Sequence, residues 1–298
     1  MKHYKFRTVI ALSLIRFYPI SKYIPDTIYL KILYWGHIGK KLDLKRPKSF
    51  NEKIQWLKIY DRKNEYSQMV DKFEVKQYVS NIIGAKYVIP SLGVWNSFDD
   101  IDLKSLPNQF VLKSTHDSGG IYICRDKSLF DRSKARVFFN KRLKRKIYWS
   151  HREWPYKNCK PRIIAEPYME DKEYKELRDY KFFCFGGKVK CFKIDFDRFI
   201  EHHANYYDCK GNLLPYGEAR FPPIPSKQLD MPKNLDLMIS LAEKLSTGLR
   251  FIRVDFYEVD NQVFFGELTF FPASGLGLYT EEKWDRELGD LIDLPTDN

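Results

Sequence analysis

One stretch near the carboxyl end, FIRVDFYEVDNQVFFGELTFFPASG at residues 251–275, restricts the fold of this chain more than any other. Residues 251–259 and 263–270 are rich in β-branched and aromatic side chains, and the turn-forming Asp260 and Asn261 lie between them. The stretch therefore predicts an antiparallel β-hairpin.

The predicted hairpin gathers charged side chains on one face. Alternation along the first strand puts Arg253 and Asp255 on the same side, and pairing with the return strand brings Glu267 next to Asp255. Facing carboxylates repel each other, so a hard divalent ion such as Mg²⁺, shared with phosphates, suits the arrangement. An ordinary ion pair between Arg253 and one carboxylate is the alternative.

Composition indicates a folded globular protein with an anionic partner. The 298 residues are 44% hydrophobic and 16% aromatic, which argues against disorder. Lys and Arg number 51 against 39 Asp and Glu, a net charge of +12. Such a surface attracts nucleotide phosphate, an acidic sugar, nucleic acid or a membrane leaflet, and the charge alone does not choose among them.

The five cysteines show no CxxC spacing, and their number is odd. This pattern argues against a zinc site and against a disulfide framework. We therefore expect a cytoplasmic protein.

The first residues of the chain are rich in aromatic and aliphatic side chains. The apolar run at residues 8–20 is interrupted by Arg16 and Pro19, so we expect neither a secretory signal nor a membrane span. Residues 4–34 also carry interspersed lysines and arginines. This pattern fits helices packed on the main body, which we favour, and it also fits peripheral contact with the inner face of a membrane.

Two helices are predicted next. The first follows Ser49, which forms a capping box with Glu52. The second spans residues 65–82 and contains Lys72, whose simplest interpretation is a solvated helix lysine.

A strand at residues 110–113 ends in Lys113 and leads into the loop Ser-Thr-His-Asp-Ser-Gly-Gly before another strand at 121–124. Backbone N–H groups, hydroxyls and an ammonium group in such a turn can surround phosphate oxygens. The spacing is not that of a Walker loop, so an ordinary glycine hairpin is the alternative.

The basic run at residues 132–145 has the composition of a nucleic-acid patch. No recognisable nucleic-acid module surrounds it, so we expect a positively charged lid over an acidic substrate and no nucleic acid. Residues 162–169 predict a strand that ends at Glu166, where backbone groups, Tyr168 and Met169 can contact a flat heterocycle. A hairpin at 179–194 follows and puts Asp179 and Lys181 on one face.

The order of these segments resembles the ATP-grasp superfamily. The sequence contains Asp71-Lys72, then FVLKSTHDSGG, IIAEPYM and RVDF, and finally a Gly-Glu strand that ends near Pro-x-Ser-Gly. FNEKIQW, DYKFFCF, RVDFY and GELTFFPASG are similar to the TupA-like (teichuronopeptide-type) branch. The resemblance runs from Ser49 to the carboxyl end. It implies an α+β ATP-grasp fold, in which two lobes with antiparallel sheets enclose ATP after a helical N-terminal region.

The resemblance also implies a division of the chain and a nucleotide site. The expected parts are an N-terminal helical region at residues 1–62, a small lobe with the glycine-rich loop at 63–164, and a large lobe with the metal site at 165–298. The implied phosphate contacts are Lys72, Lys113 and the loop residues Thr115, His116, Ser118, Gly119 and Gly120; the implied adenine and ribose contacts are Glu166, Tyr168, Met169 and Asp179.

The same resemblance assigns catalytic and metal positions. Arg253 falls where a charged intermediate is stabilised, and Lys181 falls near phosphate or substrate. Asp255 and Glu267 fall on the magnesium positions. Thr269 stands where the family usually has an Asn ligand, which leaves the number of metal ions open.

The family transfers the terminal phosphoryl group of ATP to a carboxylate, and an amine then attacks the acyl phosphate. The branch is associated with cell-surface polysaccharides. We therefore expect a Mg²⁺-dependent ligase that joins an amino acid or another amine to a uronic-acid group of a capsular or surface glycan precursor. The alternatives are a glycosyltransferase of the same polymers, although no DxD motif follows a nucleotide-binding strand, and a protein that binds ATP without catalysis.

Overall fold

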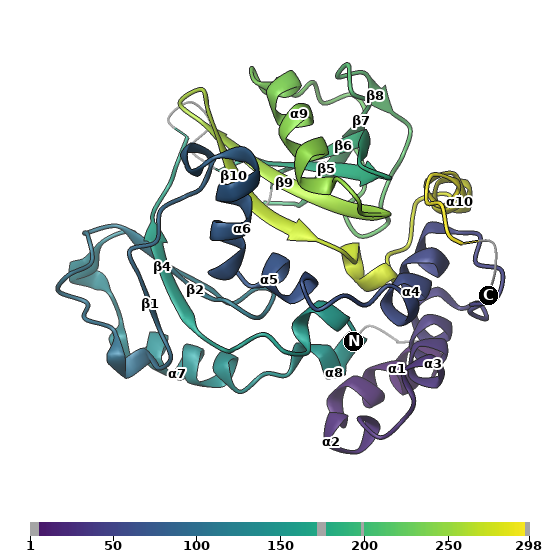
Figure 1. Cartoon of the computed structure of the whole chain (residues 1–298), viewed down its shortest axis with the longest axis horizontal. Helices are drawn as coiled ribbons and strands as arrows, with labels where there is room; N and C mark the ends of the chain where they lie inside the picture. The colour runs from purple at the N-terminus through teal and green to yellow at the C-terminus, as the bar shows by residue number, and fades with distance from the viewer. Residues whose placement is uncertain (1–5, 172–176, 198–199, 296–298) are drawn as a thin grey trace.

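The computed structural model describes residues 6–171, 177–197 and 200–295, and it contains two antiparallel β-sheets surrounded by helices (Figure 1). This arrangement confirms the expected α+β class. Tyr4 and Lys5, the first residues of the proposed membrane-contact segment, lie outside the described residues.

The smaller sheet has the strand order β1-β4-β2-β3, and one face of it packs on the basic helix α7 (Arg132–Leu143). Phe110 and Phe139 are fully buried in the core between them. Glu166 therefore lies on a strand between two neighbours. The strands are β1 (Gly93–Trp95), β4 (Ile163–Pro167), β2 (Phe110–Ser114) and β3 (Ile121–Cys124).

The larger sheet has the order β10-β9-β5-β6-β7-β8, and helix α9 (Leu235–Ser246) packs on β5, β6 and β9. Its inner strands bury nearly every residue, so each must alternate between an apolar face against α9 and a polar face toward the rest of the protein. The strands are β5 (Asp179–Phe185), β6 (Lys188–Phe196), β7 (His203–Tyr207), β8 (Leu213–Leu214), β9 (Phe251–Val259) and β10 (Gln262–Thr269).

The hairpin that opened the sequence analysis is confirmed. Asp260 and Asn261 form its turn with positive φ angles of 49° and 63°. Glu267 lies directly opposite Asp255, and a register shift between Phe265 and Glu267 sets this pairing.

The remaining helices lie beside and between the sheets. The N-terminal group is α1 (Phe6–Arg16), α2 (Tyr18–Ser21) and α3 (Asp26–Ile38); the others are α4 (Phe50–Tyr60), α5 (Tyr66–Val70), α6 (Glu74–Ile83), α8 (Ile147–His151) and α10 (Glu282–Asp290). The predicted capping box of Ser49 and Glu52 is present at the start of α4.

The single helix predicted at residues 65–82 is wrong, because the chain breaks between α5 and α6 at Asp71-Lys72. Asp71 Oδ1 accepts hydrogen bonds from the backbone N–H groups of Phe73 and Glu74 at 2.9 and 3.1 Å. These bonds satisfy donors that begin α6, so a second helix starts there. Lys72 is consequently not a solvated helix lysine.

Two hydrophobic cores are present among the described residues. The larger one joins the six-stranded sheet to α3, α4, α5, α6 and α9, and the smaller one lies between the four-stranded sheet and α7. The division of the chain at residues 62 and 164 stays a prediction. Strands β7 and β8 and helix α10 were not predicted, because their sequences are short or polar.

The N-terminal helices pack on one another through a close contact between α1 and α3, and they reach the main body at α8 and α4. Ala11 is fully buried, and a Cβ atom on Gly36 would lie 2.4 Å from the Cβ of Ala11 and 2.8 Å from the carbonyl oxygen of Arg7. Only glycine at position 36 allows this approach. None of the helices in the described part of the chain is long and apolar enough to cross a membrane.

This contact predicts a coupled effect of two substitutions. Gly36→Ala should lower the free energy of unfolding by about 1–3 kcal/mol, because it overfills the contact. Adding Ala11→Gly should recover part of the loss, since it removes the nearer clashing atom. Chemical unfolding of both single variants and the double variant measures the coupling, and strictly additive effects would contradict the proposed clash.

Candidate active site

Lys72 lies at the break between α5 and α6, where its backbone N–H donates to the carbonyl oxygen of Thr115 at 3.0 Å. Its ammonium group donates to the carbonyl oxygen of Asp117 in the glycine-rich loop. Burial lowers the pKa of Lys72, while the carboxylates of Glu267 and Asp117 oppose that effect. A desolvated ammonium group of this kind gains from an additional anion.

Lys113 and Lys76 hold the carboxylate of Glu166. The Nζ of Lys113 lies 2.5 Å from Glu166 Oε2, and the Nζ of Lys76 lies 2.6 Å from Oε1. Burial alone would raise the pKa of Glu166, but the charges of Lys113 and Lys76 outweigh it and lower that pKa. Lys76 was missed by the sequence analysis, although its spacing of four residues from Lys72 is the signal that could have found it.

The glycine-rich loop is fixed by Arg142 of α7. The Arg142 guanidinium donates to Asp117 Oδ2 at 3.1 Å and to the carbonyl oxygens of Ser118 and Gly119 at 3.2 and 2.8 Å. A Cβ atom on Gly120 would lie 1.7 Å from Ser114 Oγ, so only glycine fits there. The basic run that was expected to form a lid is thus mainly helix α7, which packs on β2 and contacts the loop directly. Its role as a lid stays a prediction.

Two loop residues point away from any open space. Thr115 is fully buried, and its hydroxyl donates to the carbonyl oxygen of Lys160 at 3.3 Å. His116 is buried as well, and burial lowers its pKa. The contacts that the resemblance implies for these two side chains stay predictions, as do those of Tyr168 and Met169, which follow β4.

The β9–β10 hairpin brings Arg253, Asp255, Glu267 and Thr269 into one cluster. Arg253 Nε and Nη2 donate to the two carboxylate oxygens of Asp255 at 2.7 and 2.6 Å. Arg253 Nη2 also lies 2.8 Å from Glu267 Oε1 and 3.0 Å from Thr269 Oγ1. The guanidinium thus occupies the space between the two carboxylates.

Charge and burial in this cluster act on each other. Burial raises the pKa of Asp255 to about 6, although Arg253 pulls it down. Burial also disfavours the charge of Arg253, yet the carboxylates of Asp255 and Glu267 hold the pKa of Arg253 above its usual value. Arg253 therefore keeps its charge although it is buried, and Asp255 is its main partner.

Lys181 continues the charged face on the next strand, opposite Asp255 in the register. Its ammonium group lies 2.9 Å from Asp179 Oδ2 and also contacts Asp195 of β6. Asp179 and Lys181 therefore share one face, as predicted. Their roles toward ribose and phosphate stay predictions.

The donor set of the hairpin fits magnesium that is shared with a ligand. The Glu267 side chain is half exposed, and its Oε2 accepts no hydrogen bond from the residues that the structure describes. Over those residues, no group of three or more His, Cys, Asp or Glu side chains could hold a metal by itself. Mg²⁺ in proteins is commonly bound by one or two carboxylates, water and phosphate oxygens, so Asp255, Glu267 and Thr269 would supply only part of the coordination.

Two cavities meet at Lys72, Tyr156 and Glu267. The first, which we call the inter-lobe cleft, lies between the smaller sheet and β10 and is lined by Lys76, Lys113 and Glu166 among others. The second, which we call the acceptor cavity, has a volume of about 420 Å³ and is lined by residues of the glycine-rich loop, α8 and the segment after β10. Tyr156 was not identified from the sequence, because its position beside both cavities depends on the fold.

The buried ion pair predicts a strong effect on stability. Arg253→Met should lower the free energy of unfolding by about 3–5 kcal/mol, because it leaves Asp255 buried without a partner. Combining it with Asp255→Asn should restore most of the loss, since the amide carries no charge. Denaturant unfolding tests this, and an unchanged midpoint for Arg253→Met would contradict the described pairing.

Comparisons with solved structures give distant matches to ligases. The chain is 15% identical to the D-alanine–D-alanine ligase of Helicobacter pylori, with a TM-score of 0.42 over 82% of this chain and 69% of that one. For the D-alanine–D-alanine ligase of Bacillus anthracis the identity is 13% and the TM-score 0.37, over 68% of this chain and 57% of that one. For an ADP complex of N5-carboxyaminoimidazole ribonucleotide synthetase they are 14% and 0.42, over 74% and 50%. The chain thus spans little more than half of the Bacillus anthracis enzyme.

No curated protein matched the sequence. The sequence model of the TupA-like ATP-grasp family, in contrast, matches residues 52–293, from the start of α4 to beyond α10. Because this match covers most of the chain, the protein belongs to the TupA-like ATP-grasp family and has the ATP-grasp fold that its motifs predict.

Proposed function

We propose that the protein is an ATP- and Mg²⁺-dependent carboxylate–amine ligase that joins an amino acid to a uronic-acid group of a surface-polysaccharide precursor. The observation that carries the proposal is the meeting of the inter-lobe cleft and the acceptor cavity at Lys72 and Glu267. A phosphoryl group at that point would have nucleotide on one side and acceptor on the other.

The lysines of the cleft support a nucleotide site. The cleft holds only about 80 Å³ of free space, and Lys76 and Lys113 are paired with Glu166. Ligand pockets usually measure about 300–1,000 Å³, so the two sheets must separate for ATP to bind. Its phosphates would then replace protein oxygens as partners of these ammonium groups.

Positioning and charge neutralisation would supply most of the catalysis. Phosphoryl transfer needs the acceptor oxygen in line and the negative charge of the phosphoryl oxygens compensated. Lys72 lines both cavities and would compensate charge at the transfer point, while Arg253 would stabilise the oxygen that becomes negative when an amine attacks. Bound Mg²⁺ would neutralise the phosphates from the side of Asp255 and Glu267.

The cationic wall of the acceptor cavity supports an acidic substrate. Lys72, Arg145 and Arg253 line it, and the whole chain has a net charge of +12. A uronate on a glycan precursor would be attracted by these charges. The family match supports a ligase over the glycosyltransferase alternative. The following test distinguishes turnover from ATP binding without catalysis.

Glu267→Ala should leave the fold intact but reduce ADP release from ATP and Mg²⁺ by about 100-fold or more, because it removes a carboxylate at the transfer point. The measurement is ADP release with glucuronate and a mixture of amino acids. Glu281→Ala, which removes an exposed glutamate beside α10, is the control and should retain full activity. Normal turnover in Glu267→Ala, or no nucleotide binding by the unaltered protein, would refute the assignment.

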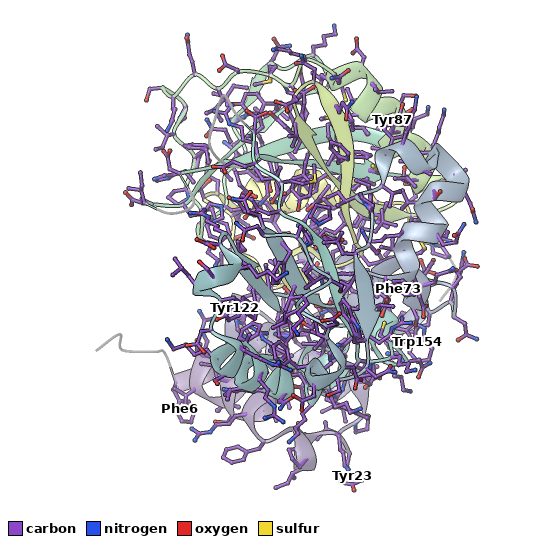
Figure 2. The ribbon with its side chains drawn as sticks, turned by 90° about the vertical axis from the view of Figure 1, so that its left-hand side faces the viewer. Phe6, Tyr23, Phe73, Tyr87, Tyr122 and Trp154 are labelled. Atoms are coloured by element: carbon purple, nitrogen blue, oxygen red, sulfur yellow. The ribbon has the colours of Figure 1, made fainter. Side chains whose placement is uncertain are left out.

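We further propose that the N-terminal helices contact the inner face of a membrane. Their outer side carries exposed apolar side chains, among them Phe6, Ile20 and Tyr23 at 78%, 74% and 79% exposure. Figure 2 shows Phe6 and Tyr23 projecting from this end of the molecule. The ammonium group of Lys22 lies 4.9 Å from the ring centre of Tyr23, a combination of basic and aromatic groups that suits anionic lipid.

The triple substitution Phe17→Ser, Ile20→Ser and Tyr23→Ser should weaken binding to phosphatidylglycerol vesicles by about tenfold or more, because apolar area for insertion is lost. Vesicle co-sedimentation measures this. Leu129→Ser is the matched control, since Leu129 is 82% exposed and lies in a short helical turn after β3, outside the N-terminal helices. Failure of the unaltered protein to bind the vesicles would rule out membrane contact.

A further inference from the structure

The acceptor cavity contains a carboxylate that none of the roles above uses. Glu153 lies between α8 and a short helix at Trp154–Tyr156, and it lines the cavity together with Ser274 and His151. The Ser274 hydroxyl donates to Glu153 Oε1. Glu153 Oε2 accepts no hydrogen bond and forms no ion pair with any residue in the described ranges.

The other carboxylates of this cavity already have partners. Asp117 is bound by Ser114 and by the guanidinium groups of Arg142 and Arg145. Glu267 is bound by Arg253. Glu267 also keeps Oε2 without a hydrogen bond among the described residues, but that carboxylate is already assigned to magnesium. Glu153 is therefore the carboxylate of the cavity whose open oxygen has no other assigned role.

The backbone that presents Ser274 to Glu153 is strained. Ala273 and Ser274 have φ angles of 47° and 56°, in the left-handed region that non-glycine residues rarely adopt. The Ser274 carbonyl oxygen accepts hydrogen bonds from Lys58 Nζ at 2.7 Å and Gln55 Nε2 at 2.9 Å, and both donors come from α4. Such strain persists only where its surroundings enforce it, and it is common at ligand sites.

Lys58 ties the two walls of this corner together. Its side chain has no exposure to solvent, and Nζ donates to the carbonyl oxygen of His151 at 3.0 Å as well as to Ser274. Burial lowers the pKa of Lys58 to about 8, and the charge of Glu153 opposes this. The lysine thus holds the backbone of both segments while Glu153 remains available to the cavity.

The neighbouring imidazole of His151 does not compete with Glu153 for a proton. Burial lowers the pKa of His151 to about 3, and the positive charge of Lys58 acts in the same direction. The imidazole is therefore neutral and holds a proton poorly. Burial raises the pKa of Glu153, which makes its carboxylate a better proton acceptor than an exposed glutamate.

Tyr156 links this corner to the transfer point. Burial raises the pKa of Tyr156 well above its usual value, and the negative charges of Glu153 and Glu267 both add to the effect. Both carboxylates are therefore close enough to act on the same phenol. A ligand group bound at Glu153 would therefore lie in the same cavity of about 420 Å³ as Glu267.

We propose that Glu153 forms the amine subsite, where its free oxygen binds the ammonium group of the amine substrate and removes one proton from it. This inference rests on the proposed ligase function and adds the residue that selects a primary amine. The neutral amine then forms its bond to the acyl carbon, and the carbon–oxygen bond to phosphate breaks. The leaving phosphate takes that electron pair and the second proton from nitrogen, and Glu153 returns its proton to solvent.

The test compares two nucleophiles on the full-length protein with ATP, Mg²⁺ and glucuronate. Hydroxylamine is uncharged at neutral pH and needs no deprotonation before attack, whereas the amino groups of an amino-acid mixture arrive as ammonium ions. Glu153→Gln should lower the ratio of amide to hydroxamate by about 100-fold or more, the usual range for a lost general base. In this variant the amide rate should also keep rising with pH, as the fraction of free amine grows.

Glu281→Gln is the matched control, because it makes the same change at an exposed glutamate outside the cavity. Its ratio should stay within about fivefold of the unaltered protein. An equal loss of both products in Glu153→Gln would show that Glu153 only maintains the shape of the cavity, and an unchanged ratio would show that the amine binds elsewhere. Absence of hydroxamate from the unaltered protein would instead refute the ligase function itself.

Discussion

The guanidinium of Arg253 lies between the carboxylates of Asp255 and Glu267, and the polar face of the large sheet depends on this interaction. Strand pairing places the two carboxylates opposite each other, and burial of Asp255 removes the water that would otherwise screen its charge. A cation must therefore be present in the resting protein. The register continues to Lys181 and then to Lys193, so positive charge follows negative charge across the sheet.

Cationic groups are likewise paired with protein oxygens in the inter-lobe cleft. Lys72 donates to the loop at Asp117, while Lys76 and Lys113 share Glu166. These partners satisfy the ammonium groups when no polyphosphate is bound, and in this state the cleft is narrow. Binding of ATP, as proposed, would therefore exchange partners: each lysine would replace a protein oxygen with a phosphate oxygen, without a second desolvation of the ammonium group.

The features predicted correctly from the sequence are those that depend on residues close together along the chain. The hairpin, its turn and the facing Asp255 and Glu267 follow from alternation and turn chemistry, and the capping box of Ser49 follows from four consecutive residues. The position of Lys72 was predicted wrongly because the cap that Asp71 forms at the start of α6 was not recognised. The contact of Lys72 with Thr115, 43 residues later, also depends on the fold. Glu153 was not identified from the sequence because the acceptor cavity joins segments that are distant along the chain.

The N-terminal helices connect the two halves of the proposed activity. Ile15 of α1 lines the acceptor cavity, while Phe17, which directly follows the same helix, is exposed on its outer side. An 11-residue helix is about 16 Å long, so a membrane surface touching Phe17 would lie within that order of distance from the cavity wall. If the proposed membrane contact and substrate hold, a lipid-linked glycan precursor would present its uronate to the cavity while its anchor stays in the bilayer. The packing of α1 on α3 would then serve substrate delivery as well as stability.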